Sequence, residues 1–152
     1  MSYNKSKVSI IIASKNEGEG IKKILKSVNK YSNDIIVVDG HSNDGTKELV
    51  KDFGARFFLD HKKGRGDALK IGIKKAKKEI LIFFDADGSH DEKDIPNFVS
   101  LILKKEADLV IGSRRTGGSS DINVNLVGII RSAGCDFLVS LVNHKFKTSL
   151  TD

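Results

Sequence analysis

The sequence predicts an α/β fold: a mainly parallel, Rossmann-like sheet with helices on both faces. Short apolar runs alternate along the chain with segments whose apolar residues recur at helical spacing. The runs hold almost no polar residues, which is typical of strands buried on both faces. Strands that alternate with helices in this way form parallel sheets with right-handed crossovers.

Each element can be placed from its own residues. We expect strands at residues 8–13, 35–39, 56–59, 80–85 and 107–112. We expect helices at residues 17–31, 44–53, 67–78 and 94–105. The first helix has an apolar face, formed by Ile21, Ile24, Leu25 and Val28. Gly54 is suited to end the second helix, and Pro96 is tolerated in the first turn of the last.

The fourth expected strand is the stretch around which the chain is organised. Its apolar run ends at Asp85, and Asp87 follows two residues later. Residues two apart on an extended strand point to the same side, and two close carboxylates repel unless a cation lies between them or one is protonated. Carboxylate oxygens suit Mg²⁺ or Mn²⁺. The alternative is a solvated Asp-Ala-Asp-Gly turn that binds no metal.

Three strand ends carry polar residues that should meet at the carboxyl edge of the sheet, where open α/β sheets bind ligands. They are Ser14, Lys15, Asn16 and Glu17 after the first strand, Asp39, Gly40, Ser42, Asp44 and Gly45 after the second, and Asp85, Asp87, Ser89 and His90 after the fourth. An acidic strand end is typical of a ribose or base site, which favours Asp39 as a ligand contact. Asp44 also fits a helix cap. Arg65, between two glycines, is a weaker candidate for cradling a diphosphate.

Composition limits the class of protein. The chain has 152 residues, enough for one domain with a substantial core. It has no apolar stretch of the roughly 18 residues that a spanning helix needs, and its polar start does not resemble a signal peptide. The single cysteine fits a reducing compartment, so we expect a cytoplasmic protein.

The net charge of +6 favours anionic partners: nucleotide phosphates, acidic lipid head groups or nucleic acid. The lysines appear scattered in pairs over the expected helices, so a solvated surface explains most of them. We therefore expect no nucleic-acid partner. After a loop at residues 116–123, residues 124–142 form an apolar-rich segment of helical length. This helix either packs in the core, or it rests on a membrane or covers an acceptor site.

Five blocks of the chain resemble family 2 glycosyltransferases, which have the GT-A fold. They are IIASKNEGEGI, VVDGHSNDGT, KKGRGDALKIGIKKAKKE, FFDADGSH and VIGSRR, which cover residues 8–115 in the family's order. The branch that they resemble most is that of the polyprenyl-phosphate (dolichyl-phosphate) mannosyl and glucosyl transferases. The resemblance implies a nucleotide-sugar-binding core at residues 8–115 and an acceptor loop and helix at residues 116–152, within a single catalytic domain that the family's pattern would continue past Asp152.

The resemblance also implies residue roles. A GDP- or UDP-linked hexose would contact Ala13, Ser14, Asn16, Glu17, Asp39, Gly40, Arg65, Gly66, Asp85 and Ala86. Mg²⁺ or Mn²⁺ would lie on Asp85, Asp87 and Ser89, and a polyprenyl phosphate on Arg114, Arg115, Arg131 and Ser132. Asp87 and Arg114 would be catalytic. The protein would then contact the cytoplasmic face of a membrane peripherally. Ala13 and Gly40 depart from the family's proline and aspartate, and Ser89 from its glutamine.

Other functions remain open at this point. A family 2 enzyme with a soluble or polysaccharide acceptor would have the same donor blocks. The stretch FFDADGS also resembles the motif of haloacid-dehalogenase-type phosphatases, in which Asp85 would accept a phosphoryl group. That motif normally lies on the first strand of its fold, whereas here it lies on the fourth expected strand. A third possibility is a nucleotide-binding module without catalysis.

Overall fold

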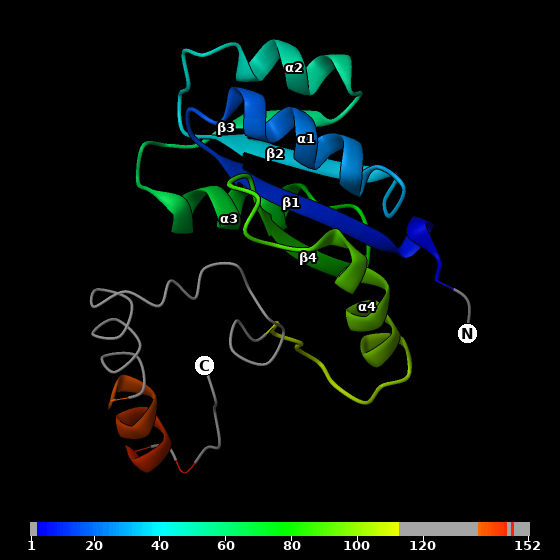
Figure 1. Cartoon of the computed structure of the whole chain (residues 1–152), viewed down its shortest axis with the longest axis vertical. Helices are drawn as coiled ribbons and strands as arrows, with labels where there is room; N and C mark the ends of the chain where they lie inside the picture. Colours follow the sequence, from blue (N-terminus) through cyan, green and yellow to red (C-terminus); the bar gives the residue numbers. More distant parts are fainter. Residues whose placement is uncertain (1–2, 113–136, 146, 148–152) are drawn as a thin grey trace. The chain divides into compact units, whose positions relative to one another are not determined.

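A computed structural model describes residues 3–112, 137–145 and 147. The chain divides into two compact units, Met1–Val110 and Ile111–Asp152, and each is described by itself. The first unit holds a parallel sheet with helices on both faces (Figure 1). The α/β class expected from the sequence is therefore confirmed.

The sheet has the strand order β3-β2-β1-β4 within the described residues. Its strands are β1 (Val8–Ser14), β2 (Asp34–Asp39), β3 (Arg56–Leu59) and β4 (Ile80–Asp85), and every pairing between them is parallel. β1 pairs on both sides and is buried along nearly its whole length. β1 and β2 therefore form the buried centre of the sheet, as their apolar runs predict.

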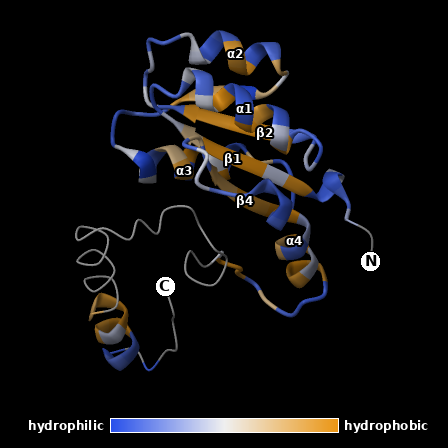
Figure 2. Ribbon diagram, viewed as in Figure 1, coloured by the Kyte–Doolittle hydropathy of each residue, from blue (hydrophilic) through white to orange (hydrophobic). Residues whose placement is uncertain are grey.

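Helices cover the two faces of the sheet in a way that follows the alternation of β1. The helices are α1 (Gly18–Val28), α2 (Thr46–Asp52), α3 (Arg65–Lys75) and α4 (Ile95–Leu103), with short 3₁₀ helices at Lys5–Lys7 and Glu92–Asp94. Ile10 and Ile12 pack in one core cluster with residues of α1, α2 and α4, whereas Ile11 packs in the other with Ala68 of α3. Figure 2 shows the apolar strands between the more polar outer faces of the helices.

A buried polar network holds the opposite, amino-terminal edge of the sheet. Ser9 Oγ donates a hydrogen bond of 2.5 Å to Asp34 Oδ2, which also accepts one of 2.9 Å from the Lys77 backbone N–H. Arg56 Nε lies 3.4 Å from Asp34 Oδ1. One carboxylate thus connects β1, β2, β3 and the segment between α3 and β4, and it is 5% exposed. Because the Lys77 N–H bonds to Asp34, the network holds the chain just after the end of α3.

Two expectations about the sheet are wrong. Residues 107–112 form no strand, and Leu109 and Ile111 are exposed. β4, expected to be buried on both faces, is an edge strand among the described residues: Phe84 is buried, but Phe83 is 43% exposed. The reason is that an apolar run signals burial but does not select a neighbour. A parallel strand needs a paired backbone on each side to be central.

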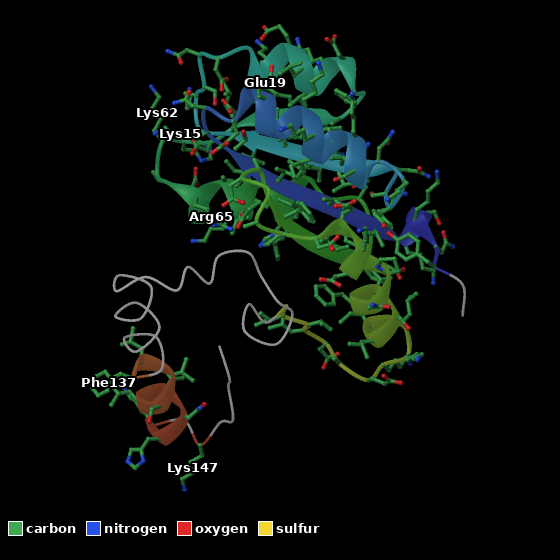
Figure 3. All side chains as sticks on the ribbon, in the orientation of Figure 1. Lys15, Glu19, Lys62, Arg65, Phe137 and Lys147 are labelled. Carbon is green, nitrogen blue, oxygen red and sulfur yellow. The ribbon has the colours of Figure 1, made fainter. Side chains whose placement is uncertain are left out.

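In the second unit, residues 137–145 are helical. Phe137, Leu138, Leu141 and Val142 are exposed large apolar residues of this helix, and Figure 3 labels Phe137 and Lys147. The remainder of the helix expected at residues 124–142 lies outside the described residues. Among the residues that are described, no helix has the length and apolar character needed to cross a bilayer.

Packing of α3 against β1 gives a first testable prediction. A Cβ placed on Gly72 would lie 2.3 Å from Ile11 Cγ2, so Gly72→Ala forces a shift between α3 and the central strand. We expect the free energy of unfolding to fall by about 1–3 kcal/mol, as in other overpacked cores.

Gly66→Ala in the same helix is the control, because a Cβ there meets nothing within 4 Å. Alanine is the better helix former, so this variant should be at least as stable as the wild type. Urea denaturation of both variants tests the comparison, and equal midpoints would contradict the close packing of Gly72.

Candidate active site

The carboxyl ends of the strands bring the expected polar residues to one edge. Ser14 pairs with Asp39 in the register of β1 and β2, and Ala13 pairs with Asp85 in that of β1 and β4. Leu59, the last residue of β3, lies opposite Asp39. The convergence predicted for the three strand ends is therefore observed, although the roles of the individual side chains stay predictions.

The loops after β1 and β2 are joined to each other by hydrogen bonds. The Gly40 N–H donates to the Ser14 carbonyl at 2.8 Å, and the Asn16 N–H donates to Ser42 Oγ at 2.7 Å. Since both bonds use backbone groups, the loops are held by main chain as well as side chains. The nucleotide-binding positions expected at 13–17 and 39–42 thus form one connected structure.

Asp44 ties the starts of two helices together. Its Oδ1 accepts hydrogen bonds from the backbone N–H and hydroxyl of Thr46, at 3.2 and 2.5 Å, at the first turn of α2. Its Oδ2 accepts the Gly18 N–H of α1 at 2.8 Å. The N-cap position of α2, expected at Asp44, is held by Gly45 at φ 83°, while the Asp44 carboxylate binds the first turn from one residue further back. The bond to α1 was not foreseen. The Thr46 hydroxyl and then the Gly18 N–H lower the pKa of Asp44.

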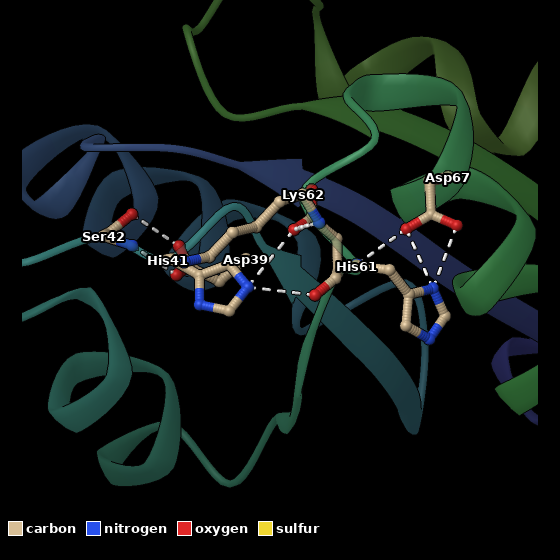
Figure 4. Close-up of polar contacts among 7 residues, drawn as sticks. Asp39, His41, Ser42, His61, Lys62 and Asp67 are labelled. Carbon is tan, nitrogen blue, oxygen red and sulfur yellow. Dashed lines mark hydrogen bonds and ion pairs between the residues drawn. The ribbon is translucent and has the colours of Figure 1, made fainter.

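Asp39 is 1% exposed and already has partners for both carboxylate oxygens. Ser42 donates its backbone N–H to Oδ2 at 2.7 Å and its hydroxyl to Oδ1 at 2.6 Å (Figure 4). A nucleoside that binds Asp39 must share these oxygens or displace the Ser42 hydroxyl. The expected nucleoside contact of Asp39 therefore remains a prediction.

Asp60 is a carboxylate at the same edge that sequence reasoning missed. Its backbone N–H donates to the Asp39 carbonyl at 3.0 Å, so it continues the pairing of β3 with β2. His41, in the left-handed region with φ 64°, places Nε2 at 3.0 Å from the Asp60 carbonyl and 3.5 Å from Asp60 Oδ1. The signal was present in the sequence, because Asp60 directly follows a strand, as Asp39 and Asp85 end theirs.

Asp85 lies between two cationic or titratable side chains. The Arg65 guanidinium, at the start of α3, donates a hydrogen bond to Asp85 Oδ1. His90 Nδ1 accepts the Asp85 backbone N–H at 3.2 Å, so its ring proton lies on Nε2, which is 3.7 Å from Asp85 Oδ2. The His90 ring also packs edge-on against Phe84, with centroids 5.2 Å apart. Arg65, expected to hold a diphosphate, is thus placed beside the expected metal residues.

Asp87 does not continue the strand. β4 ends at Asp85, and Asp87 lies in a turn that includes Gly88 at φ 79°. The expectation that Asp85 and Asp87 point to the same side of one extended strand is therefore wrong, because the strand does not reach Asp87. The Ser89 backbone N–H donates to Asp87 Oδ1 at 2.9 Å. This bond is the largest of the effects that lower the pKa of Asp87, and the nearby Arg65 charge adds to it. Asp87 is therefore ionised at neutral pH.

Close packing holds this turn against α1. A Cβ on Gly20 would lie 2.8 Å from the Ala86 carbonyl oxygen, so no larger residue fits there without moving the turn. Ala86 itself is buried. Because Gly20 has no side chain, the turn that carries Ala86, between Asp85 and Asp87, can pack directly against the first turn of α1.

The carboxylates fit a divalent ion that arrives with its ligand. Within the described parts of the chain, no group of three or more His, Cys, Asp and Glu side chains is arranged to hold a metal. Asp85 and Asp87 supply hard oxygen donors, and Mg²⁺ is commonly held by one or two carboxylates together with substrate phosphates and water. Ser14 Oγ at the same edge is buried without a hydrogen-bond partner, which leaves a polar group for a ligand to satisfy.

The expected acceptor residues Arg114, Arg115, Arg131 and Ser132 lie outside the described residues.

Comparison with known proteins identifies the family. The profile of glycosyl transferase family 2 matches residues 9–144. The chain belongs to glycosyl transferase family 2. An uncharacterized protein of Methanocaldococcus jannaschii is 37% identical over 95% of this chain and 62% of its own length. The RfbJ protein of Shigella flexneri is 26% identical over 78% of this chain and 94% of its own length.

Solved structures show the same fold as this family 2 chain. Mannosyl-3-phosphoglycerate synthase from Rubrobacter xylanophilus aligns with a TM-score of 0.57 at 20% identity, over 64% of this chain and 36% of that one. Glucosyl-3-phosphoglycerate synthase from Mycobacterium tuberculosis, solved with Mn²⁺, UDP-glucose and phosphoglyceric acid, aligns with a TM-score of 0.57 at 22% identity, over 65% and 40%. The chain thus spans less than two thirds of the archaeal relative and of both synthases. The expected GT-A fold is confirmed.

The hydrogen bonds of Asp44 to the first turns of α1 and α2 predict that the stability of the fold depends on pH. Because the folded-state pKa of Asp44 is lowered, its stabilising effect is present above the unfolded pKa of about 3.9 and is lost as the pH falls through the folded value. Asp44→Asn should therefore melt at a lower temperature than the wild type at pH 7. The difference should shrink below about pH 4.

Thermal denaturation between pH 3 and 7 measures this difference. Asp52→Asn, at the end of α2, is a control with the same loss of charge. If Asp44→Asn lowers the melting temperature by the same amount at every pH, the stabilising effect does not depend on ionisation of the Asp44 carboxylate, which would contradict the prediction.

Proposed function

We propose that the protein transfers a hexose, mannose or glucose, from a GDP- or UDP-linked donor to a polyprenyl phosphate, with Mg²⁺ or Mn²⁺. The observation that carries the proposal is the placement of Asp85 and Asp87 at the carboxyl edge of the sheet, next to the joined loops after β1 and β2. Family 2 membership supports sugar transfer. The complexes of the mycobacterial synthase hold Mn²⁺ or Mg²⁺ with UDP, which supports the choice of donor and ion.

On this proposal, the donor diphosphate lies at Asp85 and Asp87. When bound there, a divalent cation neutralises the charge that develops on the departing nucleoside diphosphate. Asp87 is already ionised at neutral pH, so it binds the ion without first losing a proton. Arg65 orients Asp85 through its hydrogen bond, and Gly20 leaves room for the turn that carries Asp87. Asp39, close to Ser14 at the same edge, is the proposed nucleoside contact.

The acceptor requires different chemistry. A phosphate monoester is anionic at neutral pH and acts as its own nucleophile, so no general base is needed. Arg114, Arg115 and Arg131 are proposed to hold that phosphate, because guanidinium groups bind phosphate oxygens in pairs. Ser132 is proposed to contribute a hydrogen bond. The exposed Phe137 and Leu141 would face lipid, at the cytoplasmic surface of a membrane.

A soluble phosphorylated acceptor is the second candidate. The two synthases to which the chain is similar are named for 3-phosphoglycerate products, and one was solved with phosphoglyceric acid. The same arginines and donor site would serve such an acceptor. A phosphatase that uses Asp85 is disfavoured, because that carboxylate is held by Arg65 and the chain belongs to a glycosyltransferase family.

Asp87→Asn tests the donor site. The variant should lose the Mn²⁺-dependent part of the thermal stabilisation by UDP or GDP, because an amide is a far weaker ligand for a hard cation. Differential scanning fluorimetry with each nucleotide, with and without Mn²⁺, measures the effect.

Asp91→Asn is the matched control. Asp91 is an exposed carboxylate four residues away that accepts a hydrogen bond from the Lys93 N–H. Metal-dependent stabilisation that survives in Asp87→Asn, or disappears equally in Asp91→Asn, would remove Asp87 from the metal site.

Arg114→Ala tests the acceptor. Loss of charged hydrogen bonds worth about 1.5–3 kcal/mol should reduce transfer to polyprenyl phosphate by about ten- to a hundredfold, while binding of the nucleotide donor is unchanged. Transfer of radiolabelled hexose into the lipid fraction measures the rate. Parallel reactions with 3-phosphoglycerate separate the two acceptors. Normal lipid transfer by the variant, or transfer to phosphoglycerate alone, would contradict the polyprenyl-phosphate proposal.

A further inference from the structure

The positive charge of the chain is concentrated in one short segment. Residues 56–78 contain nine lysines and arginines and only two acidic residues, so this segment carries a net charge of +7, whereas the whole chain carries +6. The remaining residues are therefore close to neutral. The basic residues are Arg56, Lys62, Lys63, Arg65, Lys70, Lys74, Lys75, Lys77 and Lys78. The earlier interpretation of scattered, merely solvated lysines does not hold for this segment.

The structure places part of this charge on α3, beside β3. β3 is the outermost strand beside β2, and α3 covers the face of the sheet that holds Ile11 and Val38. We call the surface formed by β3, α3 and the loop between them the β3–α3 face. It carries Lys70, Lys74 and Lys75, all of which are exposed.

The lysines of this face are not neutralised by neighbouring acids. Among the described residues, no carboxylate lies within 4.0 Å of the ammonium groups of Lys70, Lys74 or Lys75. The two acidic residues of the segment have other partners. Asp60 accepts the Lys62 N–H at 2.9 Å, and Asp67 accepts the His61 N–H at 2.7 Å (Figure 4). The positive charge of Lys70, Lys74 and Lys75 is thus available to an external anion.

A groove and exposed aliphatic side chains accompany these charges. A cavity of about 340 Å³ lies between β3 and α3, lined by Phe58, Leu59, Lys70, Ile71, Lys74 and Lys75 among others. Leu59, which lines this groove, is 49% exposed, and Ile73 of α3 is 45% exposed, so two large apolar side chains of the β3–α3 face reach solvent. Together with the exposed lysines, they give this face a surface that suits a partner that is both anionic and apolar.

An anionic bilayer combines these two properties. Lysines near such a surface are attracted to acidic head groups, and aliphatic side chains enter the boundary between head groups and acyl chains. Single-stranded nucleic acid would instead use aromatic rings for base stacking. The ring of Phe58 in this groove is covered by Lys75 and Arg56, whose charged groups lie 5.2 and 5.6 Å from its centre. The other ring of the groove, His61, lies 3.1 Å from Asp67 Oδ1 through its Nδ1.

We propose that the β3–α3 face binds the surface of an anionic membrane. Arg65 begins α3 and contacts Asp85, so the face adjoins the candidate active site. Binding through this face would hold that site beside the lipid surface. The proposal does not depend on the identity of the acceptor, because it concerns adsorption of the protein and not sugar transfer.

Vesicle sedimentation tests the proposal with the whole chain. The wild type should bind phosphatidylcholine vesicles that contain phosphatidylserine, bind pure phosphatidylcholine much more weakly, and be released as NaCl screens the attraction. The triple variant K70E/K74E/K75E should bind the anionic vesicles at least about tenfold more weakly, since three attractive charges become repulsive.

The matched control is K22E/K23E/K26E, which changes the same number of exposed lysines on α1, a helix of the same length that packs in the other core cluster. It should retain binding to within about threefold, because only long-range charge is altered. Melting curves show whether each variant is folded, and K70Q/K74Q/K75Q replaces the first triple variant if it is not. Leu59→Ser with Ile73→Ser should weaken binding without changing its salt dependence.

Three results would overturn the proposal. The first is equal loss of binding in the α1 and α3 triple variants, which would show that net charge alone acts. The second is binding that is lost in Phe137→Ser with Leu141→Ser but kept in the α3 variant, which would assign the contact to the helix at residues 137–145. The third is binding to single-stranded DNA or polyphosphate without binding to anionic vesicles, which would assign the face to a soluble polyanion.

Discussion

The pairing of β1 with a neighbour on each side is the interaction on which the structure depends. It buries Ile10, Ile11 and Ile12 completely, one side chain toward α3 and two toward the other helices. Because all pairings are parallel, each strand delivers its carboxyl end to the same edge. The register of β1 then sets Ser14 beside Asp39 and Ala13 beside Asp85, which is how residues far apart in the sequence form one site.

The edge is stiffened by polar groups that satisfy one another before any ligand arrives. Ser42 occupies both oxygens of Asp39, Asp44 joins α1 to α2, and Arg65 holds Asp85. Such bonds reduce the cost of ordering the loops on binding of a ligand at this edge. At Asp87, the Ser89 backbone N–H that the carboxylate accepts lowers its pKa and keeps it ionised.

The two edges of the sheet have different characters. The amino-terminal edge is held by the buried carboxylate of Asp34, which accepts hydrogen bonds from β1 and from the end of α3. The carboxyl edge gathers Asp39, Asp60 and Asp85, while the exposed Lys70, Lys74 and Lys75 lie on the adjoining β3–α3 face. An acidic site that suits a cation is thus bordered by a basic surface that suits phosphates. Enzymes that act on anionic substrates benefit from this arrangement, because the field concentrates the substrate near the site.

The sequence by itself determined the fold class, the positions of four strands and four helices, and the edge at which the polar residues meet. These follow from apolar periodicity and from the parallel connections that it implies, both of which are local properties. Only the tertiary structure decided that β4 lies at an edge among the described residues, that residues 107–112 form no strand, and that Asp87 leaves the strand in a turn against Gly20. It also decided that Asp60 joins the site and that Lys70, Lys74 and Lys75 of α3 form no ion pair within the described residues. Each of these depends on which backbone or charge lies alongside, and a pattern along one chain does not specify its neighbours in space.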